Sequence, residues 1–405
     1  MPPKMTAHAT KNEIQKGSEV LRRVYFFIAE HEMYNDAAIH LAEGLHEIGV
    51  PFSANRNFWQ IEPDQSAYLF TTDPRIRPED CAVVVLTTLW FHYMEPETFE
   101  IKGLDMPDGL VGSGRRNKLV LLDAEDGYKT TSFEPLFRKF DIVFRTKMNR
   151  HTFNFPNMSP WILGFGQRII KATSNTPSFA RRKRCIVQNF GFTHKFTHGV
   201  RRVAADRFLN RVESHFALDC KHSLPNVAPN LPWDLLMWNQ TVGKHNPDYY
   251  KQLCEAQCVA CFCGDFAPGL PRDPSVLLVG GNKARLLRLF YFILSRVLHI
   301  SDRIIQWDSW RFWETLMSGS VAIHANLEKY GVDIPVMPVN WKHYIGLDFD
   351  NIDRDINRFL ALDQEQLSRI GTCGREWALD NYSPSASAIR FLATIKSEIP
   401  IRNHA

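Results

Sequence analysis

Short apolar runs separated by longer connections constrain the fold of this chain most strongly. Four of them lie between Val24 and Phe144, and they are Val24–Ile28, Ala82–Leu86, Leu119–Leu122 and Phe140–Phe144. Runs of this length are typical of strands buried on both faces of a parallel sheet. After the first run, residues 36–48 carry apolar side chains at helical spacing and end at Gly49. The pattern predicts an α/β fold in which crossover connections join parallel strands.

The same pattern restarts in the second half of the chain. Cys185–Val187, Cys258–Cys263 and Ser320–His324 are strand-like, and Arg201–Val212 is helical. A chain of 405 residues exceeds one ordinary domain. We therefore predict two α/β units with a cleft between their sheets. The predicted boundaries are a flexible tail at 1–20, a first domain at 21–170, a linker at 171–184, a second domain at 185–385 and a closing segment at 386–405.

Charge is unevenly distributed along the chain. The formal net charge is +4, yet residues 142–205 contain twelve Lys or Arg side chains and no Asp or Glu. Aromatic residues are interleaved with these cations, as surfaces that stack single-stranded bases require; they are Phe153, Phe155, Trp161, Phe165, Phe179, Phe190, Phe192 and Phe196. Binding of single-stranded nucleic acid is therefore an alternative function. The acidic remainder of the chain opposes it, and we expect no nucleic-acid partner.

The most informative segment begins at Ser309. Its side chain is suited to cap a helix over 310–317, and Gly319 is suited to end that helix. A helix N-terminus attracts anions, and Arg311 in the first turn adds a contact for phosphate. Glu314 lies one turn further on the same face and is suited to accept bonds from ribose hydroxyls. An ordinary amphipathic helix with a Ser cap and an Arg–Glu pair has the same spacing.

This segment resembles the nucleotide-sugar motif of the exostosin-type glycosyltransferases, in which Ser-x-Arg-x-x-Glu-Ala leads to a glycine, an apolar strand, a proline and a tryptophan. The matching positions are Ser309, Arg311, Glu314, Gly319, Val321, Pro335 and Trp341. Segments 184–202, 250–264 and 375–392 resemble other elements of that family, so the resemblance covers about 184–392. Thr315 replaces the usual alanine, residues 266–305 form an insertion, and the usual membrane anchor is absent.

The resemblance implies two Rossmann-like domains facing a central cleft (GT-B type), with acceptor and nucleotide-sugar sites in the first and second domains. A closing helix at 386–405 would pack back on the first domain. The implied activity is transfer of a hexosyl or pentosyl group from a nucleotide-diphosphate sugar to a glycan or lipid-linked acceptor, as in polysaccharide biosynthesis. We expect inversion, and neither metal nor other cofactor. The donor-binding residues carried over are Gly191, Thr193, Lys195, Arg201, Arg202, Ser309, Arg311 and Glu314. A non-catalytic relative that only binds the sugar nucleotide is a further alternative.

An inverting transfer needs a base, and the carboxyl ends of the strands in the first domain are the expected place for it. Glu30 and His31 follow the first apolar run, while Asp123, Glu125 and Asp126 follow the third. The second group is also suited to bind a divalent metal or acceptor hydroxyls. Solvated loop and turn residues show the same composition, so these catalytic assignments are hypotheses.

Two further segments have alternative interpretations. Cys254, Cys258, Cys261 and Cys263 match a zinc site in number but not in spacing, so we predict small buried side chains. Residues 283–303 combine apolar and basic residues, which suits a helix lying on an anionic membrane or a core helix whose arginines reach solvent. We favour the core helix. With no signal peptide and no long apolar run, we expect a cytoplasmic protein. The alternative helix would place it at the inner membrane face.

Overall fold

The computed structural model describes residues 23–29, 36–64, 66–91, 93–94, 101–110, 115–124, 134–152, 154–192, 199–219, 227–272 and 282–397. Several predicted features lie outside these ranges, namely the tail at 1–20, Glu30, His31, Glu125, Asp126, Phe153, Thr193, Lys195 and Phe196.

Six parallel strands form the first sheet, in the order β10-β9-β8-β5-β1-β2. They are β1 (Val24–Phe27), β2 (Phe52–Ala54), β5 (Val83–Thr87), β8 (Lys118–Asp123), β9 (Ile142–Arg145) and β10 (Met158–Pro160). The four predicted apolar runs are the four inner strands, which are buried on both faces. The two edge strands are only three residues long, and their sequences carry no comparable apolar run.

Five parallel strands form the second sheet, in the order β12-β11-β13-β16-β17. They are β11 (Lys183–Val187), β12 (Ala217–Asp219), β13 (Ala256–Ala260), β16 (Val321–Ala325) and β17 (Ile345–Leu347). Counted within each sheet, the strand order begins 2-1-3-4-5 in both. The predicted fold class, two Rossmann-like α/β units, is confirmed. The strand predicted at Cys258–Cys263 begins earlier, at Ala256, and ends at Ala260.

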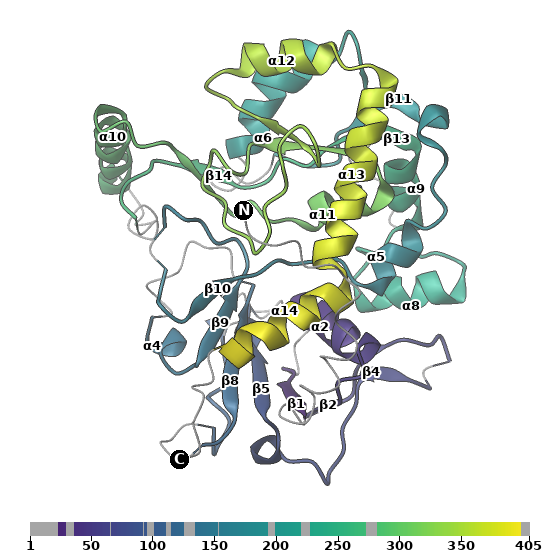
Figure 1. Cartoon of the computed structure of the whole chain (residues 1–405), viewed down its shortest axis with the longest axis vertical. Coiled ribbons are helices and arrows are strands. Elements are labelled where there is room, and N and C mark those ends of the chain that lie inside the picture. The colour runs from purple at the N-terminus through teal and green to yellow at the C-terminus, as the bar shows by residue number, and fades with distance from the viewer. Residues whose placement is uncertain are drawn as a thin grey trace.

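Helices cover the sheets of both halves (Figure 1). The longer ones are α2 (Asp36–Glu47), α5 (Gln167–Ala172), α6 (Gly199–Ala204), α8 (Pro232–Gln240), α9 (Pro247–Glu255), α10 (Asn282–Val297), α11 (Trp310–Ser318), α12 (Ile352–Leu360), α13 (Gln364–Tyr382) and α14 (Pro384–Ser397). Short elements are α3 (Thr88–Phe91), α4 (Glu134–Phe137) and α7 (Asn210–Val212), with hairpins β3 (Phe58–Gln60) to β4 (Tyr68–Phe70), β6 (Tyr93–Met94) to β7 (Ile101–Lys102), and β14 (Asp265–Ala267) to β15 (Arg303–Ile305).

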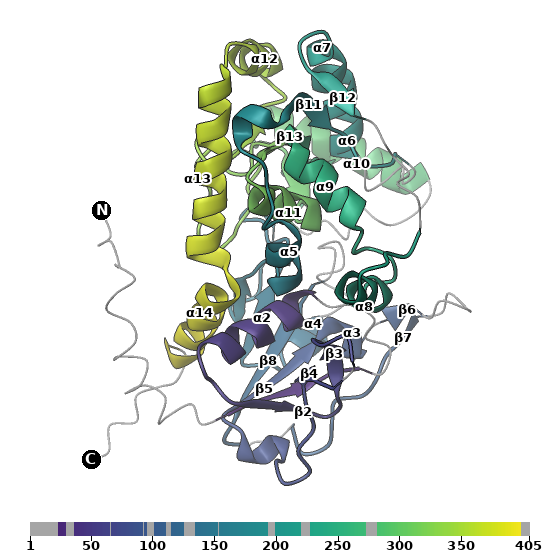
Figure 2. The same cartoon turned by 90° about the vertical axis from the view of Figure 1, so that its right-hand side faces the viewer.

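Two helices from the second half of the chain pack on the first half (Figures 1 and 2). α14 lies against α2, where His40 Nε2 and Ser387 Oγ are 2.9 Å apart. Gly44 allows this close approach, because a Cβ there would lie 1.9 Å from the carbonyl oxygen of Pro384. α8 contributes Leu236 and Met237 to the core of the first sheet. The second half is therefore fastened to the first at two separate places.

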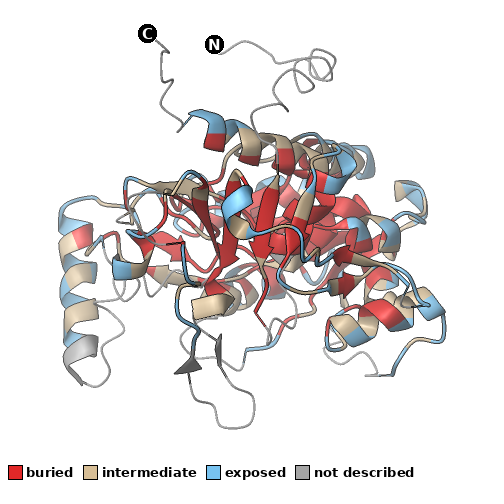
Figure 3. Ribbon diagram, turned by 90° about the horizontal axis from the view of Figure 1, so that it is seen from below, coloured by how far each residue is buried: buried red, intermediate tan, exposed pale blue. Residues whose placement is uncertain are grey.

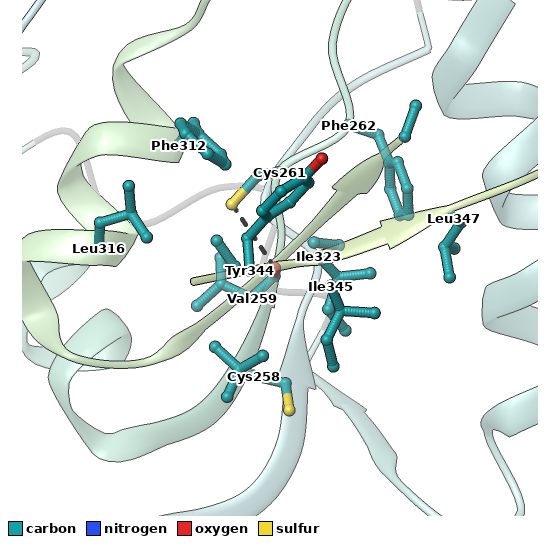
Figure 4. Packing of buried hydrophobic residues seen from close by; sticks show 14 of the residues in the cluster. Cys258, Val259, Cys261, Phe262, Phe312, Leu316, Ile323, Tyr344, Ile345 and Leu347 are labelled. Carbon is teal, nitrogen blue, oxygen red and sulfur yellow. Dashed lines mark hydrogen bonds between the residues drawn. The ribbon is translucent and has the colours of Figure 1, made fainter. Parts of the chain in front are cut away.

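Two of the four cysteines predicted as small buried side chains, Cys258 and Cys261, lie in the core of the second sheet (Figure 4). Cys254, Cys258 and Cys261 are buried, whereas Cys263 is partly exposed. The Cys261 thiol donates to the carbonyl of Val259, at 3.5 Å, and burial raises its pKa to about 12. These thiols therefore act as packing groups between strand and helix.

The core position predicted for the helix at 283–303 is wrong. In α10, Leu286 and Val297 are each 67% exposed, and Leu289, Phe290 and Ile293 are more than half exposed. Periodicity identifies an apolar face but not what covers it, so the sequence pattern could not separate the two interpretations. Among the described residues, no helix is both long and apolar enough to cross a bilayer.

Candidate functional site

A cavity of about 400 Å³ opens beside the N-terminus of α11. It is lined by Arg168, Asn189, Arg201, Lys244, Asn246, Tyr249, Ser309, Trp310, Arg311 and Glu314. Four of these side chains are cationic, and one is acidic. The cavity borders the end of β11, where the second sheet reverses its strand order, and ligands of such sheets bind at that place.

α11 begins and ends as the sequence predicts. Ser309 occupies the N-cap position with extended backbone angles, and Gly319 ends the helix with φ 68°. The predicted capping bond is absent, and the Ser309 side chain accepts no hydrogen bond from the backbone amides of the helix. Among the described residues its buried Oγ has no hydrogen-bond partner. The first turn of α11 therefore presents uncapped amides beside an unsatisfied hydroxyl, which is a favourable arrangement for an anion.

Asp308 holds the start of α11 in place. Its carboxylate accepts one hydrogen bond from the backbone N–H of Leu163, at 2.8 Å, and one from Trp313 Nε1, at 2.6 Å. Burial raises the pKa of Asp308 to about 6. Trp313 and Phe312 are fully buried in the same core. Leu163 follows the last strand of the first sheet, so this contact connects the two halves next to the cavity.

Two arginines organise the loop after β11. Arg311 donates to the carbonyl of Asn189, and Arg201 donates to the carbonyls of Gly191, at 3.1 Å, and Phe262, at 3.0 Å. Their guanidinium groups lie 5.8 Å and 5.4 Å from the ring centre of Phe190. The loop backbone and this ring keep both cations at the cavity wall.

Glu314 is buried at the cavity wall and bound by two tyrosines. Tyr249 donates its hydroxyl to Oε2, and Tyr250 donates to Oε1, each at 2.9 Å. Burial, and then the charge of Glu314, raise the pKa of Tyr249 well above its usual value, so this hydroxyl remains a donor. Each carboxylate oxygen keeps a second lone pair. The two tyrosines therefore fix the orientation of the Glu314 carboxylate, which can still accept further hydrogen bonds.

A buried polar network holds the hydroxyl of Tyr250 in place. Arg168 donates to the Tyr250 hydroxyl, and its Nη1 lies 3.4 Å from Nδ1 of His245. His245 Nε2 in turn lies 3.2 Å from Asp234 Oδ1. Burial and the neighbouring Arg168 lower the pKa of His245 to about 4. The histidine is therefore neutral near pH 7, and Arg168 remains the cation of the network.

The structure brings four of the predicted donor-binding residues together around one cavity. Ser309, Arg311, Glu314 and Arg201 line it. Gly191 contributes its carbonyl as a partner of Arg201. Arg202 does not line the cavity, and its Nη2 donates to the carbonyl of Phe192, at 3.3 Å. Thr193 and Lys195 lie outside the described residues.

Asp123 does not occupy an open position. Its side chain has no exposed area, and Oδ2 lies 3.3 Å from Nη1 of Arg145, which is also buried. Thr88 Oγ1 donates to the other carboxylate oxygen at 3.2 Å. This geometry gives Asp123 a structural contact instead of the access to an acceptor that a general base requires. The other candidate bases, Glu30, His31 and Glu125, lie outside the described residues.

Among the described aromatic residues of the basic segment, most do not offer a stacking surface. Phe155, Trp161, Phe165 and Phe190 are buried in the cores, whereas Phe192 is 38% exposed. Of the described cations in this segment, only Arg168 and Arg201 line the cavity. Bases cannot stack on buried rings, so the structure does not favour the nucleic-acid alternative.

The sequence did not indicate six of the lining residues as site residues, namely Arg168, Asn189, Lys244, Asn246, Tyr249 and Trp310. Asn246 caps α9 by accepting from the backbone N–H of Asp248, at 2.9 Å, and this Asn-Pro start was a readable signal for a helix. Lys244 lies 4.7 Å from the ring centre of Trp310, which only the tertiary fold brings near. No local pattern connects these two residues.

Comparisons of the sequence with known proteins found no match, whereas comparison of the structure found solved structures of low sequence identity. No protein-family model matches the chain, and no curated protein matches it significantly. Solved structures with similar overall shape include an alpha-glucosyltransferase in complex with UDP, at 9% identity and TM-score 0.45, with coverage of 93% of this chain and 99% of that one. A glycosyltransferase from Rickettsia africae has 10% identity, TM-score 0.46 and coverage of 94% and 99%. Anabaena Alr3699/HepE, in complex with UDP and glucose, has 10% identity, TM-score 0.39 and coverage of 93% and 100%.

Proposed function

We propose that this chain is a glycosyltransferase and that the cavity beside α11 binds the nucleoside diphosphate of its sugar donor. One observation supports this most. An uncapped helix N-terminus, an unsatisfied serine hydroxyl and four cations converge on a cavity with a single acidic lining residue. A diphosphate has the charge and size for such a site. This local chemistry, and not the overall likeness to known structures, supports the proposal.

The roles of the lining residues follow from their positions. The first amides of α11 and the Ser309 hydroxyl would donate to phosphate oxygens, with Arg311 and Arg201 neutralising their charge. Glu314, oriented by its two tyrosines, would accept hydrogen bonds from the ribose hydroxyls. This assignment places the diphosphate at Arg311 and Arg201 and the ribose at Glu314, whereas Arg168 supports Glu314 through the Tyr250 hydroxyl.

The chemical step is cleavage of the bond between the anomeric carbon and the diphosphate oxygen. Negative charge develops on the leaving diphosphate, and preorganised cations stabilise it most where little water reaches. We propose that Arg311 and Arg201 do this without a metal. We also propose that an acceptor hydroxyl attacks from the opposite face, with inversion. Its proton would pass to a base in the first half, for which Glu30, His31 and Glu125 remain the candidates.

Release of nucleoside diphosphate from a panel of nucleotide sugars tests this function. We expect slow hydrolysis of one donor by the wild type, faster release with a glycan or lipid-linked acceptor, and no loss of rate in EDTA. Arg311→Ala should remove the activity, while Arg369→Ala, which removes an exposed arginine of α13, should retain it. Absence of release from every donor, or full activity of Arg311→Ala, would contradict the proposal.

A further inference from the structure

α10 presents a continuous apolar stripe to solvent. Leu286 is 67% exposed, Leu289 55%, Phe290 57%, Ile293 53% and Val297 67%. These positions are three or four residues apart, so they lie along one face of the helix. A soluble monomer rarely exposes so many large apolar side chains together, and such stripes mark surfaces that bind something.

The opposite face of α10 holds the helix to the second half of the chain. Ser295 is fully buried, and its Oγ accepts from the backbone N–H of Leu270, at 3.1 Å. Arg288 lies near enough to Asp265 for their charges to interact. In Figure 3, α10 is the helix at the left edge, and most of its coloured ribbon is intermediate or exposed. The stripe is therefore the outer face of an anchored helix.

The charge of the helix indicates what covers the stripe. Residues 282–299 contain four basic residues, Lys283, Arg285, Arg288 and Arg296, and no acidic residue. Arg296 is exposed beside the stripe, where its guanidinium lies 5.2 Å from the ring centre of Phe292 and 3.0 Å from a carboxylate oxygen of Asp302. Apolar side chains flanked by cations and aromatic rings match the interface of an anionic bilayer.

A second copy of the chain is a poorer occupant for this surface. In a two-fold dimer the same patch meets itself, so α10 would pack on α10. The helix carries four basic residues and no acidic one, so two copies of it would bring like charges together. Anionic phospholipids supply negative charge that a second copy of α10 lacks.

We propose that α10 docks the protein on the surface of an anionic lipid bilayer, with its apolar stripe at the boundary between headgroups and acyl chains. The helix lies in the interface and does not span the membrane. This inference does not depend on the donor assignment, because none of the described side chains of α10, at 286–297, lines the cavity.

Co-sedimentation of the full chain with vesicles tests the proposal. We expect at least tenfold stronger binding to phosphatidylcholine vesicles containing about one third phosphatidylglycerol than to pure phosphatidylcholine, and weaker binding at high salt. Leu289→Glu and Ile293→Glu, each alone, should reduce binding about tenfold or more. Val339→Glu changes an equally exposed apolar residue outside α10 and should bind as the wild type does.

Light scattering and thermal unfolding complete the experiment. Both α10 variants should unfold within a few degrees of the wild type, because the changed side chains are exposed. No sedimentation with anionic vesicles, or equal binding by the α10 variants and the wild type, overturns the proposal. A wild-type dimer that the α10 variants convert to monomer, without vesicle binding, also overturns it and assigns the stripe to self-association.

Discussion

The two halves of this protein share a strand order but use the carboxyl edges of their sheets differently. In the second half, the edge near β11 opens into a cavity with four cationic side chains. In the first half, the described residues of the same edge bond to one another. Asn55 satisfies both the N–H and the carbonyl of Ile28, at 2.7 Å and 3.1 Å, and Asp123 pairs with Arg145.

The same strand order therefore does not by itself produce a binding site. Strand order determines where a crevice forms, whereas the side chains beyond the strands decide whether it binds a ligand. Near β11 the polar groups point into a cavity, and near β1 and β8 they are used to hold the sheet together. Substitutions in the two halves should therefore differ in kind, with losses of stability in the first and losses of binding in the second.

Asp123→Ala should have the largest effect, and the effect should be on stability. Breaking a buried ion pair leaves Arg145 as an uncompensated charge, which costs about 3–5 kcal/mol of unfolding free energy in urea denaturation. Asp141→Ala removes a partly exposed partner of Arg115 and should cost about 1 kcal/mol. Retained stability with lost transferase activity would instead identify Asp123 as a catalytic residue.

Arg311→Ala should weaken nucleoside-diphosphate binding without unfolding the protein. Charge-assisted hydrogen bonds contribute about 1.5–3 kcal/mol, so we expect a 10- to 100-fold higher Kd by calorimetry. The midpoint of thermal unfolding should stay within a few degrees of the wild type, because Arg311 is only partly buried. Unchanged affinity for every diphosphate tested would refute its role as a phosphate contact.

Tyr249→Phe should have a smaller effect on the same equilibrium. It removes one of the two hydroxyls that orient Glu314, which is worth about 1 kcal/mol or roughly a fivefold higher Kd. Tyr68→Phe is the matched control in the first half, where the hydroxyl accepts from Gln60. If both variants weaken binding equally, the contrast between the halves is wrong.

The smallest effect concerns pH. Because the pKa of His245 is lowered to about 4, the histidine stays neutral from about pH 8 to about pH 5.5 and begins to gain its proton only as the pH falls toward 4. The ratio of Kd values between wild type and His245→Gln should therefore be constant over that interval. A ratio that changes with a midpoint near the ordinary histidine pKa would show that His245 titrates in the site.

The sequence predicts the inner parts of both sheets well. Strands such as Val83–Thr87 are buried on both faces and so appear as uninterrupted apolar runs. Edge strands such as Ala217–Asp219 are short and partly exposed, so no apolar run indicates them. The helix at Trp310–Ser318 was readable because a serine and a glycine flank it.

The sequence predicts only those site residues that lie close together on one helix. Ser309, Arg311 and Glu314 lie on one helix, where spacing determines which side chains share a face. Lys244 and Asn246 come from the turn between α8 and α9, and only packing of the whole domain brings them to the cavity. Local spacing carries no information about such contacts, nor about the exposure of α10.

A structure of the protein with a bound nucleoside diphosphate, chosen by a thermal-shift screen of the common bases, tests the central claim most directly. We expect the diphosphate to lie against Ser309 and Arg311 at the start of α11, with the ribose hydroxyls at Glu314. A nucleotide bound elsewhere, or no stabilisation by any nucleoside diphosphate in the screen, would show that the cavity beside α11 is not a donor site.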